Sequence, residues 1–154
     1  LAAIAIPNYL KAVKKTEGME VVWVIKEFAK AQKMYHLTYG EYPLTLDQLP
    51  VDLSNIGHFK RVSDTGVAWV GKWSLIINQN TKNACAYSQR NDSFNKIVIC
   101  GDLNMYQPNT ITCRTSADME DDSFCRSLGG VEYNPKRTYC GWGPGESCLN
   151  LGNL

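Results

Sequence analysis

The chain has 154 residues, of which 44% are hydrophobic, and a formal net charge of +1. This length is typical of one compact domain with its own core. A net charge so close to zero gives no bulk electrostatic attraction to nucleic acid or to an anionic membrane surface. The six cysteines include no C-x-x-C pair, which favours disulfides over a metal site and indicates an oxidising compartment.

The first ten residues, LAAIAIPNYL, form an uncharged apolar run that contains a proline. Pro7 removes one backbone donor and favours a kink at this point of a helix. About 20 apolar residues are needed to span a bilayer. We therefore expect this run to be the end of a membrane-compatible helix whose first half is missing from the sequence.

Residues 1–38 are predicted to form one helix, with residues 1–20 protruding and residues 21–38 packed on a globular head. In the second part, apolar residues recur every three or four positions, which is typical of a helix that buries one face. They are Val21, Val24, Ile25, Phe28, Ala31 and Tyr35. Gly18 costs such a helix about 1 kcal/mol relative to alanine, and we interpret it as a flexible point. Gly40 is well placed to end the helix in a left-handed conformation.

The head, residues 39–154, is predicted to consist of a loop (39–66), a sheet (67–100) and a cysteine-rich region (101–154). The predicted strands, where apolar residues alternate with others, cover residues 67–70, 73–78, 84–89 and 96–100. The C-terminal region has few periodic apolar residues, so it needs covalent staples to hold one shape. The predicted fold class is therefore α+β. A long N-terminal helix packs on an antiparallel sheet of three to four strands, and disulfide-stapled loops follow.

The cysteines are predicted to pair with their neighbours in the sequence. The favoured pairs are Cys85–Cys100, Cys113–Cys125 and Cys140–Cys148, although other pairings remain open. The first bridge would tie adjacent strands together, and the other two would hold the C-terminal loops. A zinc site is the alternative, and it is disfavoured because ligand pairs two to four residues apart are missing.

Two motifs resemble the type IV pilins and the related type II secretion pseudopilins. The segment LAAIAIPNYLKA (residues 1–12) is similar to the spine helix of that family. The segment YHLTYGEYPLTLDQL (residues 35–49) is similar to its helix exit, an aromatic-rich G-x-Y-P turn followed by an L-x-x-L segment. Residues 50–154 match no motif of the family, and its processing site and N-terminal acidic residue have no counterpart in this sequence. The resemblance implies a pilin fold.

The resemblance also implies a structural subunit that polymerises through its N-terminal helix into an extracellular type IV pilus fibre. Adhesion, motility or DNA uptake would be roles of the fibre. The implied partners are other pilin subunits, the pilus assembly machinery, the bacterial inner membrane before assembly and a host surface, and the isolated head is not expected to bind nucleic acid. The residues expected to carry assembly are Leu1, Ala2, Ala3, Ile4, Ala5, Ile6, Pro7, Tyr9 and Leu10.

One alternative is a pseudopilin that builds a periplasmic pseudopilus, which bound calcium would favour. The candidate ligands are the hard oxygens of Asp118, Glu120, Asp121 and Asp122. The D-x-D-x-D-G pattern of a calcium loop is absent, so the plain interpretation is a solvated acidic loop and no metal or cofactor is expected.

A second alternative is a minor pilin whose head is a binding module. Trp142 lies between two glycines and would then be a surface contact, although local packing over a disulfide explains it equally well. An enzyme is not expected, because neither His36 nor His58 lies in a recognisable nucleophile setting.

Overall fold

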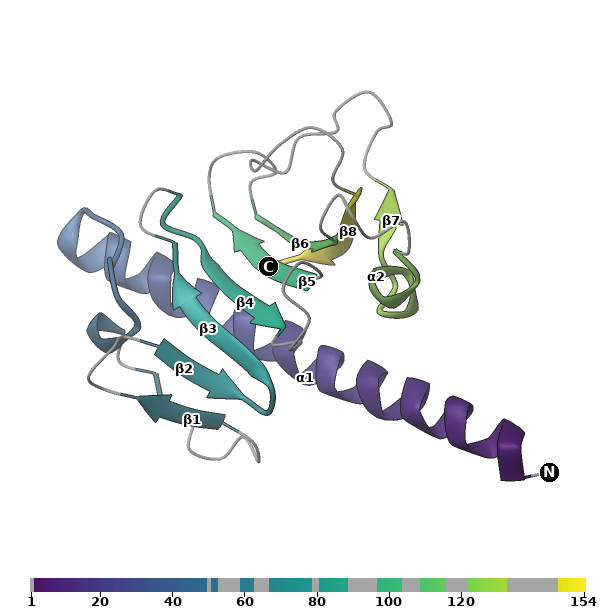
Figure 1. Cartoon of the computed structure of the whole chain (residues 1–154). Helices are drawn as coiled ribbons and strands as arrows, with labels where there is room; N and C mark the ends of the chain where they lie inside the picture. The colour runs from purple at the N-terminus through teal and green to yellow at the C-terminus, as the bar shows by residue number, and fades with distance from the viewer. Residues whose placement is uncertain are drawn as a thin grey trace.

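In the structure, a computed structural model, one long helix lies across an antiparallel sheet. It describes residues 2–49, 51–52, 59–62, 67–78, 81–88, 97–103, 109–115, 122–132 and 147–154. Helix α1 (Ala2–Tyr39) corresponds to the helix expected over residues 1–38, and it continues through both Pro7 and Gly18. In Figure 1 its C-terminal half lies behind the strands, and its N-terminal half projects beyond them.

Helix α1 is held on the head by one side of its second half. The first four members of the predicted apolar stripe are at most 3% exposed. The last two, Ala31 and Tyr35, are partly buried against the same core. Burying a large apolar side chain contributes about 1.5–3 kcal/mol, so this stripe is the main attachment of α1.

The helix ends at the glycine that the sequence predicts. Gly40 has a φ of +77°, the left-handed conformation, and its N–H donates a hydrogen bond to the carbonyl oxygen of His36 at 2.8 Å. The chain then makes a 3-10 turn, η1 (Leu46–Gln48). Leu46 and Leu49 are each 2% exposed, so this turn anchors the helix exit in the core.

The described strands form one sheet in the order β1-β2-β3-β4-β5-β6-β8-β7, and each pair of neighbours is antiparallel. The strands are β1 (Phe59–Val62), β2 (Val67–Val70), β3 (Trp73–Ile77), β4 (Ala84–Ser88), β5 (Ile97–Asp102), β6 (Thr110–Thr115), β7 (Val131–Glu132) and β8 (Ser147–Asn153). Strand β8 lies between β6 and β7, although it follows both in the sequence.

The predicted fold class, a pilin fold with a sheet of three to four strands, is wrong, because the described residues form a sheet of eight strands and the fold is rich in β-structure. Strands β6, β7 and β8 lie in the region that was predicted to be stapled loops. Ile111, Cys113 and Leu149 in that region are at most 1% exposed and belong to the core that includes α1. The C-terminal region therefore holds its shape partly through its own buried side chains and not through disulfides alone.

The Cys85–Cys100 disulfide joins β4 to β5, where the two cysteines lie directly opposite each other with Cα atoms 4.2 Å apart. The strand neighbours Ala86 and Ile99 belong to the core beneath α1. Successive side chains of a strand point to opposite faces, so this bridge lies on the sheet face away from α1.

The Cys113–Cys125 disulfide joins β6 to the short helix α2 (Ser123–Ser127), and both cysteines belong to the core on the α1 side. These two bridges confirm two of the predicted pairs. Cys148 is also disulfide-bonded, and its predicted partner Cys140 lies outside the described residues.

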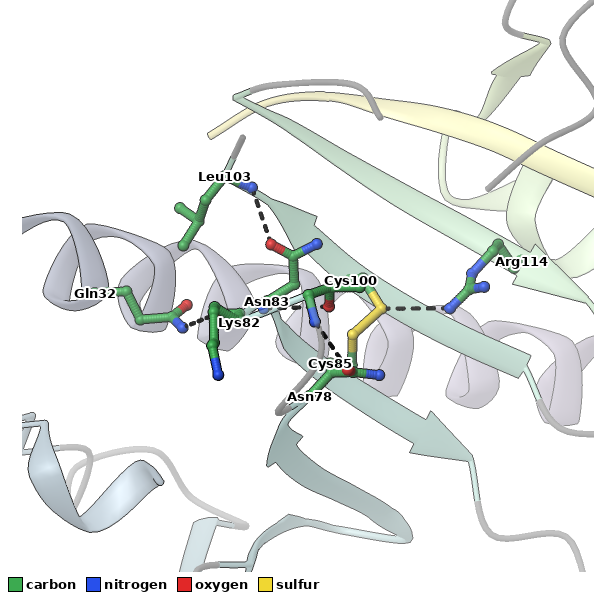
Figure 2. The surroundings of a disulfide bond; sticks show 9 residues. Gln32, Asn78, Lys82, Asn83, Cys85, Cys100, Leu103 and Arg114 are labelled. Atoms are coloured by element: carbon green, nitrogen blue, oxygen red, sulfur yellow. Dashed lines mark hydrogen bonds between the residues drawn. A yellow bond between two sulfur atoms is a disulfide. The ribbon is translucent and has the colours of Figure 1, made fainter. Parts of the chain in front are cut away.

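A buried arginine adjoins the first bridge (Figure 2). Arg114 of β6 is 4% exposed, and its Nη2 donates to Cys100 Sγ at 3.6 Å. On the same face, burial raises the pKa of Tyr87, while a hydrogen bond from Asn78 and the charge of Arg114 act in the lowering direction. This face of the sheet therefore contains a polar cluster, with Arg114 buried and Tyr87 and Asn78 half-buried, beside a covalent cross-link.

Candidate assembly surface

The first half of α1 carries exposed apolar side chains. Residues 8–17 are exposed or half-buried, and Gly18 is the first buried residue after them. Tyr9 is 69% exposed and Leu10 is 51% exposed. Large apolar side chains gathered on a projecting element are typical of interaction surfaces.

These two are the only residues predicted for assembly whose side chains the structure describes. The backbone of residues 2–7 is helical, and their side chains lie outside the described part of the chain, as does Leu1. The predictions for Ala2, Ala3, Ile4, Ala5, Ile6 and Pro7 therefore remain predictions from the sequence.

A second apolar stripe follows the side of α1 that faces away from the sheet, and we call it the outer stripe. Its members, Tyr9, Met19, Trp23, Met34 and Leu37, are 48–77% exposed. At about 100° per residue they fall within roughly a quarter of the helix circumference. Trp23 lies two residues from both Val21 and Ile25, which are fully buried, so it points to the opposite side of the helix.

Charged residues interrupt the outer stripe between Trp23 and Met34. Lys30 Nζ lies 2.6 Å from Glu27 Oε1, and the lysine side chain is 63% exposed. Such an exposed pair contributes little to stability. Because α1 also carries the exposed lysines Lys11, Lys14 and Lys15, its free surface combines apolar and basic groups.

Aromatic contacts fix the end of the outer stripe at the helix exit. The rings of His36 and Tyr42 have centroids 4.3 Å apart, and those of Tyr35 and Tyr39 are 4.4 Å apart. Leu37, which follows His36 in the sequence, is 77% exposed. The aromatic residues of the predicted G-x-Y-P exit thus brace the turn and leave Leu37 available for contact.

The sequence interpretation missed four members of the outer stripe, namely Met19, Trp23, Met34 and Leu37. The signal was present in their spacing of four, eleven and three residues, which returns to one side of a helix each time. It was overlooked because the buried stripe and the lysines already accounted for the amphipathic pattern.

Most residues of the other candidate sites lie outside the described part of the chain. Asp122 binds Arg126 through both carboxylate oxygens at 2.9 Å from Nε, while Asp118, Glu120 and Asp121 lie outside the described part, as does Trp142. Among the residues that are described, no three His, Cys, Asp or Glu side chains gather as a metal site. His36 packs on an aromatic ring, and His58 is outside the described ranges.

No helix in the described ranges combines the length and the apolar character needed to span a lipid bilayer. No protein-family model, no curated protein and no solved structure matches this chain. The proposal for its function therefore depends on the surface of α1 and on the two sequence motifs.

Proposed function

We propose that this chain is a structural subunit that polymerises through α1 into an extracellular fibre of the type IV pilus kind. The observation that carries the proposal is the arrangement of α1, which buries one stripe in the head and leaves a projecting half and the outer stripe exposed. Trp23 and Leu37 are exposed by half or more of their surface and belong to a stripe of large apolar side chains on one side of α1, and such a grouping is typical of interaction surfaces.

The chemistry of this surface suits contact with other helices. Removing Tyr9, Trp23 and Leu37 from water would each contribute on the order of 1 kcal/mol or more, and the contact can repeat along a long helix. The small residues expected near the N-terminus allow close approach between helices. An apolar helix segment can also exchange lipid neighbours for helix neighbours at little cost, since both surroundings are apolar.

The proposal places the projecting half of α1 against the head-bound half of α1 in a neighbouring subunit. The projecting half and the head-bound half of α1 are different surfaces at opposite ends of one helix. A contact between unlike surfaces is heterologous, and it generates a filament unless the rotation closes a ring. In this proposal the inner membrane holds the subunit before assembly, and the heads form the outer wall of the fibre.

The first test is cryo-electron microscopy of material sheared from the surface of cells that express the full-length protein with its assembly machinery. We expect long fibres built mainly of this chain, with α1 at the fibre core. The same chain confined to the periplasm would instead identify a pseudopilin. Its presence only at fibre tips would identify a minor pilin with a binding head. Fibres with α1 exposed on the outside would contradict assembly through α1.

A further inference from the structure

The short helix α2 touches α1 at the point where α1 leaves the head. A Cβ atom placed on Gly18 would lie 2.7 Å from Phe124 Cζ and 2.9 Å from Leu128 Cδ2. Real Cβ atoms do not approach other atoms so closely, so the glycine provides space for α2. The structure therefore gives the glycine that the sequence suggested as a flexible point a second role, the close contact with α2.

The position of this contact is significant for the projecting half of α1. Gly18 is the first buried residue after residues 8–17, which are exposed or half-buried, and the next buried residue toward the sheet is Val21. Within the described residues, Phe124 and Leu128 therefore contact α1 about one helical turn nearer to its N-terminus than the sheet does. Without that hold, a helix end with no buried face would fray.

One covalent bond anchors α2 to the sheet. Cys125 of α2 is 1% exposed and is bonded to Cys113, a fully buried residue of the interior strand β6. The ring of Phe124 also packs on Trp73, with ring centroids 6.0 Å apart. A five-residue helix has little stability of its own, so the disulfide and these few contacts keep it on α1.

We infer that the Cys113–Cys125 disulfide is an oxidation-dependent clamp that presses α2 onto Gly18 and so orders the base of the projecting helix. Closing the clamp forms one S–S bond. The two thiols lose two protons and two electrons to the disulfide of a thiol-oxidising protein, which becomes a dithiol. Because both sulfur-bearing side chains are buried, the closed bridge is shielded from thiol attack, and the clamp acts as a maturation step that is completed once.

The ordering of the helix base is a property of the single chain. Its use, which is to present the projecting half of α1 in a fixed direction for assembly, rests on the proposed function. A subunit with the clamp open would offer its neighbours a mobile helix and would lose binding free energy in ordering it.

The test is amide hydrogen exchange on the full chain with the substitutions Cys113→Ala and Cys125→Ala together. We expect residues 12–20 to exchange about tenfold faster or more through local opening. Residues 22–32 lie on the core and report global unfolding, so they should lose protection to a similar extent in this variant and in its control. The matched control is Cys85→Ala with Cys100→Ala, which removes a bridge on the other face of the sheet and should leave residues 12–20 within about twofold of the parent. Equal effects of the two double variants on residues 12–20, or no effect of either, would overturn the clamp.

A second pair of variants keeps the test decisive if the loss of the bridge unfolds the head. Phe124→Ala with all disulfides intact should also speed exchange at residues 12–20. Gly18→Ala should also push α2 away, but alanine stabilises the helix by about 1 kcal/mol relative to glycine, so its effect on residues 12–20 should be smaller than that of Phe124→Ala. Unchanged exchange at residues 12–20 in Phe124→Ala would contradict the inference, whatever the outcome of the imaging of fibres.

Discussion

Gln32, a fully buried residue of α1, donates a hydrogen bond from Nε2 to the main-chain carbonyl oxygen of Lys82 at 2.6 Å. Lys82 lies between β3 and β4 and has a φ of +60°, a conformation that a lysine seldom adopts. The contact, visible in Figure 2, joins the helix to a turn fifty residues away. It fixes where α1 crosses the sheet more specifically than apolar packing does.

Replacing Gln32 with alanine should lower the free energy of unfolding by about 2–4 kcal/mol, because the variant leaves a cavity and removes the Nε2 donor from the part-buried carbonyl oxygen of Lys82. Urea denaturation would measure the change. Thr38→Ala, on an exposed position of the same helix, is the control and should stay within about 0.5 kcal/mol of the parent. Equal costs for the two variants would mean that the turn is held by other contacts.

The pH dependence of stability should report the burial of Tyr87, whose pKa is raised above the ordinary 10.0 chiefly by desolvation. The folded state then holds the phenol proton more tightly than the unfolded state does. This contribution is fully present below the unfolded pKa and is lost as the pH rises through the higher folded pKa. Tyr87→Phe should therefore gain stability relative to the parent above about pH 10.

Urea unfolding of the parent and of Tyr87→Phe, measured from neutral pH to above pH 11, would test this sign. Below about pH 9 the difference between the two proteins should be constant, because the phenol is protonated in both states. Curves that stay parallel across the whole range would show that burial does not hold this proton.

Loss of the Cys85–Cys100 bridge should destabilise the head without changing its strand pairing. The cysteines are separated by 15 residues. A disulfide that closes a loop of that size stabilises the folded protein by about 3 kcal/mol, because it reduces the entropy of the unfolded state. The backbone ladder between β4 and β5 remains, so the circular dichroism spectrum of the Cys85→Ala, Cys100→Ala protein should match that of the parent while its urea midpoint falls. A changed spectrum would mean that the bridge sets the register.

Charge placed on the outer stripe should block assembly and leave the subunit folded. Trp23→Glu and Leu37→Glu change side chains that are at least half exposed, so each should alter the free energy of unfolding by no more than about 0.5 kcal/mol. Fibre yield in sheared material should fall about tenfold or more, because a buried apolar contact is replaced by a charge. Val131→Glu is the matched control, since Val131 is 66% exposed on β7 of the head. Normal yield from both α1 variants would remove the outer stripe from the assembly surface.

The parts that sequence reasoning reached are those where one local pattern decides the structure. The steps of three and four between Val21 and Phe28 determine the buried side of α1, and Gly40 determines its end. Cys85 and Cys100 likewise belong to two strands, β4 and β5, that the alternation of apolar residues in the sequence predicted. In each case the deciding residues lie within one or two turns or strands of each other.

The parts it missed depend on partners far away in the chain. In β6, Ile111 and Cys113 alternate with polar residues, but the cysteine was counted as a staple and the region as poor in periodic apolar residues. Gly18 gave a signal too, yet its meaning depends on Phe124, more than a hundred residues later. No local pattern predicts that β8 pairs with β6 on one side and β7 on the other.

The insertion of β8 between β6 and β7 gives the growing chain a vulnerable interval. Synthesis proceeds from the N-terminus, so residues 110–115 and 131–132 leave the ribosome before residues 147–153, which pair with both. During that interval β6 has β5 as its partner in the described sheet and an unfilled edge on its other side. Two copies of the chain that meet before β8 has paired present the same unfilled edge to each other, and it is then that they are most prone to pair.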